Sequence, residues 1–184
     1  MTELALLAKE VGTSERTLRR AVSEGTLRGK RPSPRRLKLS AAEKEYVLRR
    51  WGLLAQLRMA LRTEPNVRFA LLFGSAARGD DHSESDIDLL VEMRDPSFAR
   101  LADLELKLER ILGRDVQTLT LAEAQQDPLL FATALDEGRV IVDRDDRWPS
   151  LPGRDGRTKR RAEQQSRQRA LRALAGIDEL MSRR

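Results

Sequence analysis

The stretch "LLFGSAARGDDHSESDIDLLVEM", Leu71–Met93, decides how the rest of the sequence is interpreted. Two apolar runs flank a glycine-serine step, and Asp86 and Asp88 stand one residue apart at the start of the second run. Ionised carboxylates beside a buried strand cost free energy unless a ligand or a cation compensates them. The stretch therefore indicates a binding site rather than an ordinary connection between two strands.

The spacing of the two aspartates favours a divalent cation. Alternate residues of a strand project to the same face, roughly 6–7 Å apart, so Asp86 and Asp88 point the same way. Their carboxylate oxygens suit Mg²⁺ (or Mn²⁺), and Mg²⁺ commonly shares its coordination with substrate phosphates. Gly74 lets the backbone approach a phosphate closely, and Ser75 is expected to cap a short helix whose N–H groups favour an anion. Arg78, one turn further on, is another candidate for nucleotide binding.

The succession of a strand, G-S, a ten-residue spacer, D-x-D and a second strand resembles the minimal nucleotidyltransferases of the DNA polymerase β superfamily. The resemblance covers roughly residues 65–145. It implies an α/β (α+β) domain with a small mixed sheet flanked by helices, which uses Mg²⁺ and an NTP to move a nucleoside monophosphate onto a hydroxyl. It also implies that Gly74 and Ser75 bind the phosphates and that Asp86 and Asp88 are the catalytic metal ligands.

The third carboxylate that this family usually carries on the next strand is missing from its expected place. The chain reads "LGRDVQTLTLAEA", and an alignment without gaps puts Gln117 where the family has aspartate. Glutamine cannot accept the proton of an attacking hydroxyl and is a poorer metal ligand than a carboxylate. Asp115 has the same strand parity, so it is either a substitute catalytic carboxylate or an ordinary residue at the start of a strand. Both catalysis and nucleotide binding without catalysis stay open.

The net charge of +6 is unevenly distributed along the chain. Residues 1–40 contain ten basic and four acidic side chains, and residues 151–184 contain the same numbers. Residues 67–150 contain ten basic and 18 acidic side chains. Basic ends around an acidic middle suggest separate functions, and a basic surface favours contact with nucleic acid. The alternative is that the basic surfaces only keep the protein soluble.

Two short helices joined by a glycine-containing turn open the chain, with Thr2 and Ser14 as their caps. "TLRGKRPSPRRLKLS" then predicts two strands, near Thr26–Arg28 and Arg36–Leu39, around a basic loop. The pattern resembles the winged helix-turn-helix of bacterial regulators, a fold that also occurs in protein contacts. The resemblance implies DNA contacts from the second helix and the wing, through Arg16, Arg19, Arg20, Lys30, Arg31, Arg35 and Arg36.

Caps and periodicity predict the remaining elements. Ser40 and Glu43 form a capping box that opens a long helix ending at Pro65. We expect strands in "NVRFALLF", "SDIDLLVEM", "DVQTLTL" and "RVIVD", and helices in "PSFARLADLELKLERILG" and "DPLLFATALDEG". A last helix is expected in the basic tail, with an apolar stripe formed by Leu171, Leu174, Ile177 and Met181.

The predicted organisation has four parts: a winged helix-turn-helix over residues 1–40, a linking helix over 41–64, a nucleotidyltransferase domain over 65–148 and a basic tail over 149–184. Winged-helix regulators often bind as dimers, and the helix over 41–62 is the expected contact of a homodimer. The chain has no cysteine, no signal-like start and no apolar run of membrane length, so we expect a cytoplasmic protein without membrane contact.

The sequence thus predicts a DNA-binding nucleotidyltransferase-like protein that binds Mg-NTP. As an enzyme it transfers an NMP to a hydroxyl of a protein, in an antitoxin-type role on a partner toxin, or to a hydroxyl of a small molecule. The alternative is a transcriptional regulator whose degenerate transferase domain senses nucleotide or contacts a partner, and Gln117 favours it. Modification of an aminoglycoside-type substrate is disfavoured because no second substrate domain is evident.

Overall fold

A computed structural model describes residues 2–33, 36–151, 160 and 162–168 of the chain. Its elements in chain order are α1 (Glu3–Glu10), α2 (Glu15–Ser23), β1 (Lys30–Ser33), β2 (Arg36–Lys38), α3 (Ala41–Arg62), β3 (Val67–Phe73), α4 (Gly74–Arg78), β4 (Ile87–Met93), α5 (Phe98–Leu112), β5 (Val116–Thr120), α6 (Leu121–Ala124), α7 (Pro128–Glu137), β6 (Arg139–Asp143) and α8 (Arg147–Ser150). The four strands expected after Pro65 are confirmed. The single-turn helices α6 and α8 were not predicted. The apolar stripe expected in the tail lies outside the described residues.

The main sheet has four strands in the order β5-β4-β3-β6. Strand β3 pairs antiparallel with both β4 and β6, whereas β4 and β5 pair in parallel and are connected through α5. The sheet is therefore mixed, as the resemblance implied. Because β3 and β4 are antiparallel, the end of β3 lies beside the start of β4, and α4 with its following loop makes the connection there.

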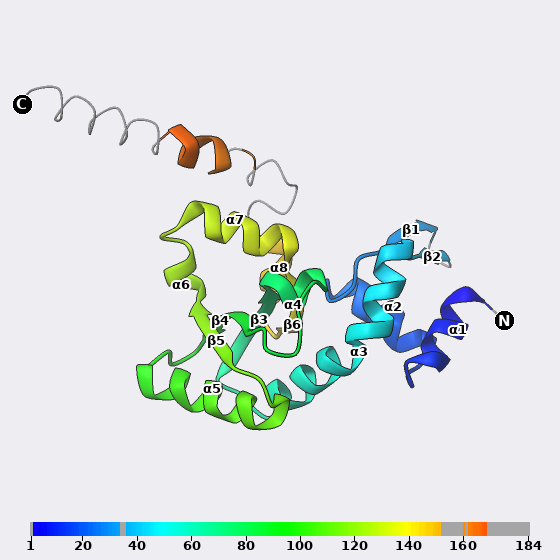
Figure 1. Cartoon of the computed structure of the whole chain (residues 1–184), viewed down its shortest axis with the longest axis horizontal. Coiled ribbons are helices and arrows are strands. Elements are labelled where there is room, and N and C mark those ends of the chain that lie inside the picture. The colour runs from blue at the N-terminus through cyan, green and yellow to red at the C-terminus, as the bar shows by residue number, and fades with distance from the viewer. Residues whose placement is uncertain (1, 34–35, 152–159, 161, 169–184) are drawn as a thin grey trace, which may run out of the picture.

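Alternation along β4 separates the two faces of the sheet. Ile87, Leu89 and Val91 belong to a core with residues of α3 and α5, whereas Leu90 packs with residues of α6 and α7 on the other side. Asp88 has the parity of Leu90, so its side chain lies on the face covered by α6 and α7. Figure 1 shows α6 and α7 beside the sheet, away from the N-terminal helices α1 and α2.

The N-terminal elements form two capped helices and a hairpin. The hydroxyl of Thr2 accepts from the amide of Ala5, and the hydroxyl of Ser14 accepts from the amide of Thr17, which confirms both predicted caps. Strands β1 and β2 pair antiparallel. The geometry is a pair of short helices followed by a two-stranded hairpin.

The first strand of this hairpin begins at Lys30, so the prediction of a strand near Thr26–Arg28 is wrong. The backbone amides of Thr26 and Leu27 donate to the carbonyl of Ala21 at the end of α2. The buried hydroxyl of Thr26 donates to the carbonyl of Val140 in β6, at 2.6 Å. Thr26 and Leu27 are therefore hydrogen-bonded to α2 and to the main sheet, and the strand that pairs with β2 begins only after them.

Helix α3 begins as predicted but does not complete a capping box. Ser40 accepts from the amide of Glu43, at 3.1 Å. The carboxylate of Glu43 is buried and binds the guanidinium of Arg139 through both oxygens, at 2.6 and 3.1 Å, and it also accepts from the amide of Arg28. The prediction of a complete capping box is therefore wrong, because the Glu43 carboxylate binds Arg139 instead of the backbone amide of Ser40.

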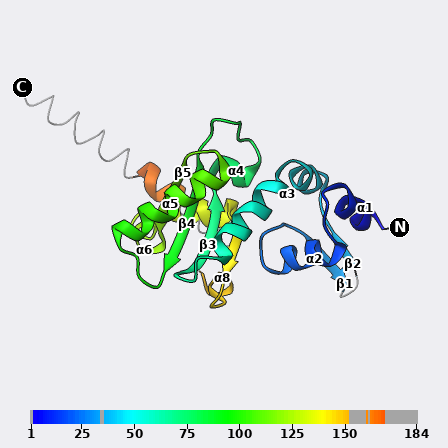
Figure 2. The ribbon, with the colours of Figure 1, turned by 90° about the horizontal axis from the view of Figure 1, so that it is seen from below.

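The N-terminal helices and the main sheet share a hydrophobic core. A single cluster of buried side chains extends from Leu4 of α1 and Leu18 of α2 through α3 to Val116 of β5. Polar contacts cross the same boundary, because Arg58 of α3 donates to the hydroxyl of Thr26, at 2.8 Å. Figures 1 and 2 show α3 running from the N-terminal elements to the sheet. The long helix therefore belongs to both units and is more than a linker.

Candidate nucleotide and metal site

Gly74 and Asp88 meet at the edge of the sheet where β3 ends and β4 begins. Phe73 is paired with Asp88 across the two strands, so the next residue of the chain, Gly74, turns away directly beside the aspartate. Gly74 has a φ angle of +70°, and a Cβ atom built on it would lie 2.3 Å from Oδ2 of Asp88. Only glycine fits both the left-handed backbone and this close approach.

Ser75 lies inside the first turn of α4, so the prediction that it caps this helix is wrong. The N-cap position belongs to Phe73, which makes no side-chain cap, because the helix begins one residue earlier than expected at Gly74. The carbonyl of Ser75 accepts from the amides of Gly79 and Asp80, at 2.8 and 3.2 Å. Ser75 thus remains next to the Gly74 turn, where the resemblance places phosphate binding.

Asp86 and Asp88 share one face of the sheet, as their spacing predicted. Burial raises the pKa of the Asp88 carboxyl above its ordinary value of 3.8, and the negative charge of Asp86 raises it further, against the attraction of Arg78. Asp86 thus places a second negative charge beside Asp88, and a cation bound between or beside the two carboxylates relieves their repulsion. The pair is therefore electrostatically prepared for a positive ion.

Gln117 completes this arrangement from the neighbouring strand. It is paired with Asp88 across β4 and β5, and its Nε2 donates to Oδ2 of Asp86, at 2.6 Å. Asp115 precedes β5 in an exposed position, and its carbonyl accepts from the amide of Ile87, at 2.9 Å. Of the two candidates for the third position, the structure brings the side chain of Gln117 to the aspartates.

The donor set fits a cation that is shared with a substrate. Among the described residues, no three His, Cys, Asp or Glu side chains come together in a way that could hold a metal ion. Two carboxylates on one face are what Mg²⁺ uses when phosphates supply further ligands. Oδ2 of Asp88 fills the space that the absent Cβ of Gly74 leaves, so the glycine turn and the aspartate belong to the same site. Asp86 and Asp88 therefore suit Mg²⁺ held together with a triphosphate.

Arg78 lies at the end of α4 and is tied to neighbouring acids. Its Nε donates to Asp80, at 3.1 Å, and its Nη1 donates to Glu137 at the end of α7, at 2.7 Å. The guanidinium is close enough to Asp88 to lower the pKa of that carboxyl. Its side chain is 43% exposed, so it remains accessible to an anion at the site.

Asp81 is a buried residue next to this site that the sequence did not single out. It stands in the loop between the two halves of the motif, where an acidic run is typical of a solvated surface. Its side chain is only 1% exposed and is paired with Arg50 and Arg114. No local signal distinguishes it from its exposed neighbour Asp80, since its partners lie about thirty residues away in each direction.

The basic side chains predicted for DNA binding differ in how they are engaged. Arg16, Lys30 and Arg36 are exposed. Arg19 and Arg20 form ion pairs within α2, with Glu15 and Glu24 respectively. Arg31 donates from the hairpin to the carbonyl of Arg19 and to the hydroxyl of Ser23, which fixes β1 against α2. Arg35 lies outside the described residues.

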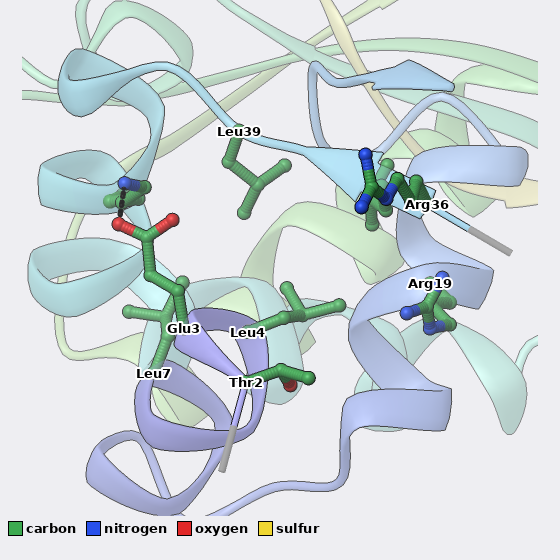
Figure 3. Close-up of a pocket in the computed structure, with 9 residues that line it drawn as sticks. Thr2, Glu3, Leu4, Leu7, Arg19, Arg36 and Leu39 are labelled. Carbon is green, nitrogen blue, oxygen red and sulfur yellow. Dashed lines mark hydrogen bonds and ion pairs between the residues drawn. The ribbon is translucent and has the colours of Figure 1, made fainter. Parts of the chain in front are cut away.

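A cavity of about 160 Å³ lies in the N-terminal unit, away from the aspartates. Figure 3 shows it between α1, α2, α3 and β2, with Arg19 and Arg36 on one side and Glu3 on the other. It is lined by Thr2, Glu3, Leu4, Leu7, Arg19, Arg36, Leu37, Leu39 and Lys44. None of the residues in the Gly74–Gln117 stretch contributes to this cavity.

The mixed sheet, the glycine turn and the paired aspartates together define a minimal nucleotidyltransferase. The family model described as "Polymerase beta, Nucleotidyltransferase" matches residues 55–147, which include the whole site. The chain belongs to the polymerase beta nucleotidyltransferase family, and it is a transferase by that membership. The prediction of a minimal nucleotidyltransferase domain is thereby confirmed.

Two curated relatives come from Methanocaldococcus jannaschii. "Putative protein adenylyltransferase MJ1379" is 39% identical over 71 residues, which are 37% of the present chain and 71% of that protein. "Putative protein adenylyltransferase MJ0435" is 40% identical over 77 residues, which are 41% of the present chain and 81% of that protein.

A solved structure described as "Crystal structure of the toxin-antitoxin with AMP-PNP" is also similar to the chain. It has a TM-score of 0.48 at 22% identity and covers 70% of the present chain and 98% of its own. At this identity and TM-score the likeness carries no functional conclusion.

In the described part of the chain, no helix is both long and apolar enough to cross a membrane.

Proposed function

We propose that the chain is a protein adenylyltransferase, which transfers AMP from ATP to a hydroxyl of a partner protein. Family membership establishes a nucleotidyltransferase, and the names of the two archaeal relatives support ATP as the donor and a protein as the acceptor. The proposal includes the antitoxin-type role that the sequence suggested, in which the acceptor is a partner toxin. A hydroxyl of a small molecule is the competing acceptor.

The proposed reaction forms one bond and breaks one. The acceptor oxygen bonds to the α-phosphorus of ATP, the bond from that phosphorus to the bridging oxygen of pyrophosphate breaks, and pyrophosphate leaves with the bridging oxygen. The acceptor hydroxyl loses its proton to a base. When bound, Mg²⁺ would neutralise charge that develops on the phosphate oxygens, and it would ease deprotonation of the attacking hydroxyl at neutral pH.

Each residue of the site has a role in this proposal. Asp86 and Asp88 hold the cation, and the turn at Gly74 and Ser75 lets the backbone approach the phosphates. Arg78 binds phosphate oxygens in exchange for its present partners, Asp80 and Glu137.

Asp115 is the proposed proton acceptor, since Gln117 occupies the third position and its amide cannot take a proton. The exposed place of Asp115 before β5 leaves its carboxylate accessible to an incoming acceptor. An Asp115→Asn variant is expected to lose transfer while it still binds Mg-ATP. Unchanged transfer in this variant rules Asp115 out as the base.

The observation that carries the transferase proposal is the contact between Gly74 and Asp88. Without a Cβ, the left-handed glycine lets a carboxylate oxygen of Asp88 lie against its backbone, which brings a proposed metal ligand directly beside the turn that is proposed to approach the phosphates. The test is incubation with Mg²⁺, ATP labelled at the α-phosphate, and a candidate partner protein or a cell extract. Protein-bound label is expected with the wild type, and Asp86→Ala and Asp88→Ala are expected to abolish it.

The matched control is Asp145→Ala, which removes an exposed aspartate that pairs with Arg68 after β6. This variant should transfer AMP like the wild type. Label that appears only in acid-soluble products would favour a small-molecule acceptor. Tight Mg-ATP binding without any transfer would favour the alternative in which the domain senses nucleotide.

We also propose that the N-terminal unit, residues 1–40, is a winged helix-turn-helix that binds DNA. The exposed positions of Arg16 on α2 and of Lys30 and Arg36 on the hairpin support this, because a helix and a wing can contact one duplex together. Two copies of the chain on a palindromic site would make the homodimer that the sequence suggested. Base readout is not specified by these contacts.

Salt dependence tests the DNA proposal directly. Binding to a mixture of short duplexes should weaken steeply between low and physiological salt, because each phosphate contact releases a counterion. Arg16→Ala and Lys30→Ala should each reduce the slope by about one. Arg100→Ala, which removes an exposed arginine of α5 with an acidic partner, is the control and should leave binding unchanged. Binding that is unaffected by salt and by these variants contradicts the proposal.

A further inference from the structure

We propose that Asp81 is a positioning residue for the metal-binding pair: clamped between two arginines, it fixes the loop that carries Asp86 to the sheet. The inference rests on the Mg-ATP site proposed above. Asp81 does not touch the site itself. Arg50 holds Asp81 on α3, and Arg114 joins Asp81 to Ser85, the residue that precedes Asp86.

The clamp has two sides, one for each carboxylate oxygen. Nε of Arg50, on α3, donates to Oδ1 of Asp81 at 2.7 Å. Nη1 of Arg114, in the turn before β5, donates to Oδ2 at 2.8 Å. The Asp81 side chain is 1% exposed and those of Arg50 and Arg114 are 22% and 16% exposed. A buried carboxylate with both oxygens occupied holds its position firmly.

The same arginines also hold the backbone of the loop. Nη2 of Arg50 donates to the carbonyl of Asp81 at 2.8 Å. Nε of Arg114 donates to the carbonyl of Ser85 at 2.9 Å, and its Nη2 donates to the same oxygen. Ser85 precedes Asp86 directly, so the peptide that links them is oriented by Arg114. Two guanidinium groups thus fix the loop at its entry and at its exit.

The position of this loop matters because its two ends adjoin the same proposed Mg-ATP site. It begins after α4, which carries the Gly74 turn, and it ends at Asp86. A binding constellation works only when its ligands are held within about 0.5 Å of the productive geometry by a supporting shell. Without the Asp81 carboxylate, the positive charges of Arg50 and Arg114 would repel each other, and only their bonds to the carbonyls of Asp81 and Ser85 would hold the loop.

The test measures metal affinity rather than stability. Mn²⁺ serves as the probe, with free Mn²⁺ followed by electron paramagnetic resonance in the presence of full-length protein and a non-hydrolysable ATP analogue. Loss of a supporting partner typically costs 10–100-fold in metal affinity. We expect a loss on the order of 10–100-fold for Asp81→Asn and a similar loss for Arg50→Gln.

Arg58→Gln is the matched control. Arg58 lies on α3 like Arg50, its side chain is equally 22% exposed, and it is paired with Glu24 of the N-terminal unit. Both variants remove one ion pair from the same helix and are expected to lower the melting temperature comparably. Only Arg50→Gln should weaken Mn²⁺ binding, because only Arg50 holds the loop.

The outcomes separate the inference from the proposed function. Wild-type affinity in Asp81→Asn and Arg50→Gln overturns the inference, as does an equal loss in Arg58→Gln. If Asp81→Asn does not fold, the comparison of Arg50→Gln with Arg58→Gln decides alone. Absence of Mn²⁺ binding in the wild type overturns the proposed Mg-ATP site and the inference with it.

Discussion

Oδ2 of Asp88 lies 2.3 Å from the position that a Cβ atom on Gly74 would occupy, so the two residues share one small volume. Strand pairing creates this contact, because Phe73 is the partner of Asp88 in the sheet and the chain turns immediately after it. The turn proposed to approach a phosphate and the aspartate proposed to hold a cation are therefore a single structural unit. Changes at one of them are expected to act on the other.

Gly74→Ala is expected to abolish nucleotide transfer while the chain still folds. The methyl group meets Asp88, and alanine is strained at a φ of +70°, at a cost of about 1–3 kcal/mol. Transfer of α-phosphate label and the free energy of unfolding are the two measurements. Gly52→Ala on α3 is the control, since nothing lies within 4 Å of its added Cβ, and it should increase stability by about 0.5–1 kcal/mol. Wild-type transfer by Gly74→Ala would contradict the site.

The raised pKa of Asp88 predicts how stability depends on pH. Burial, the nearby Asp86 and an opposing effect of Arg78 leave the folded-state pKa above the unfolded value of 3.8. Between these two values the folded state binds more protons than the unfolded state, so stability falls as pH rises through this window. Above the window, in the absence of divalent cations, Asp88→Asn should therefore melt at a higher temperature than the wild type.

Melting curves measured across pH, with and without Mg-ATP, check this prediction. The advantage of Asp88→Asn should shrink as the pH falls toward 3.8, where the wild-type carboxyl is protonated as well. Mg-ATP should stabilise the wild type by mass action and have little effect on the variant. A wild type that is more stable than Asp88→Asn without the cation would show that burial and Asp86 do not destabilise the ionised Asp88 carboxylate.

Gln117→Asp is expected to make the stability of the protein more dependent on a bound cation and to increase the rate of AMP transfer when Mg²⁺ is present. The change replaces the amide that donates to Asp86 with a third negative charge, so the melting temperature without metal should fall. With Mg²⁺ the new carboxylate supplies a ligand and a base, and transfer should rise by at least about tenfold, within the usual range of general-base effects. Gln117→Ala removes the hydrogen bond without adding charge and should show no gain in transfer. A Gln117→Asp variant that gains nothing with Mg²⁺ would mean that position 117 supplies neither a metal ligand nor a base, which leaves Asp115 as the proposed proton acceptor.

Glu43→Ala is expected to destabilise the fold strongly. Its carboxylate neutralises Arg139, which is buried, donates to the carbonyl of Ala77 in α4, and stacks 3.3 Å from the ring centroid of Tyr46. Removing one partner of a buried ion pair typically costs about 3–5 kcal/mol. Denaturant unfolding measures the loss.

Glu45→Ala, two residues further along α3, is the matched control for this change. Glu45 is 62% exposed and its ion pair with Arg49 lies on the surface. The expected change is below about 1 kcal/mol. Equal effects of the two substitutions would show that the Glu43–Arg139 pair does not hold α3 to the sheet.

Local patterns were sufficient for most elements of this fold. Thr2, Ser14 and Ser40 each accept from an amide three residues ahead, a signal contained in four consecutive residues. The G-S and D-x-D motifs predicted the turn at Gly74 and the shared face of the aspartates for the same reason. Such signals need no knowledge of the tertiary structure.

The contacts that were not predicted join residues far apart in the chain. Glu43 binds Arg139, 96 residues away, and Thr26 binds Val140, 114 residues away. Both replaced a local expectation, a capping box in one case and a strand in the other. Asp80 and Asp81 are identical neighbours, yet one is exposed and the other is buried between arginines. Which of them is buried depends on Arg50 and Arg114, which reach the loop only in the folded chain.

The continuous core from α1 to β5 has a consequence for unfolding. Leu4 and Val116 belong to one cluster of buried side chains, so the N-terminal helices cannot open without exposing apolar surface next to the sheet. The chain should melt in a single cooperative transition, with equal calorimetric and van't Hoff enthalpies. A nucleotide bound at the aspartates should then slow hydrogen exchange at those amides of α1 that exchange through opening of the whole molecule.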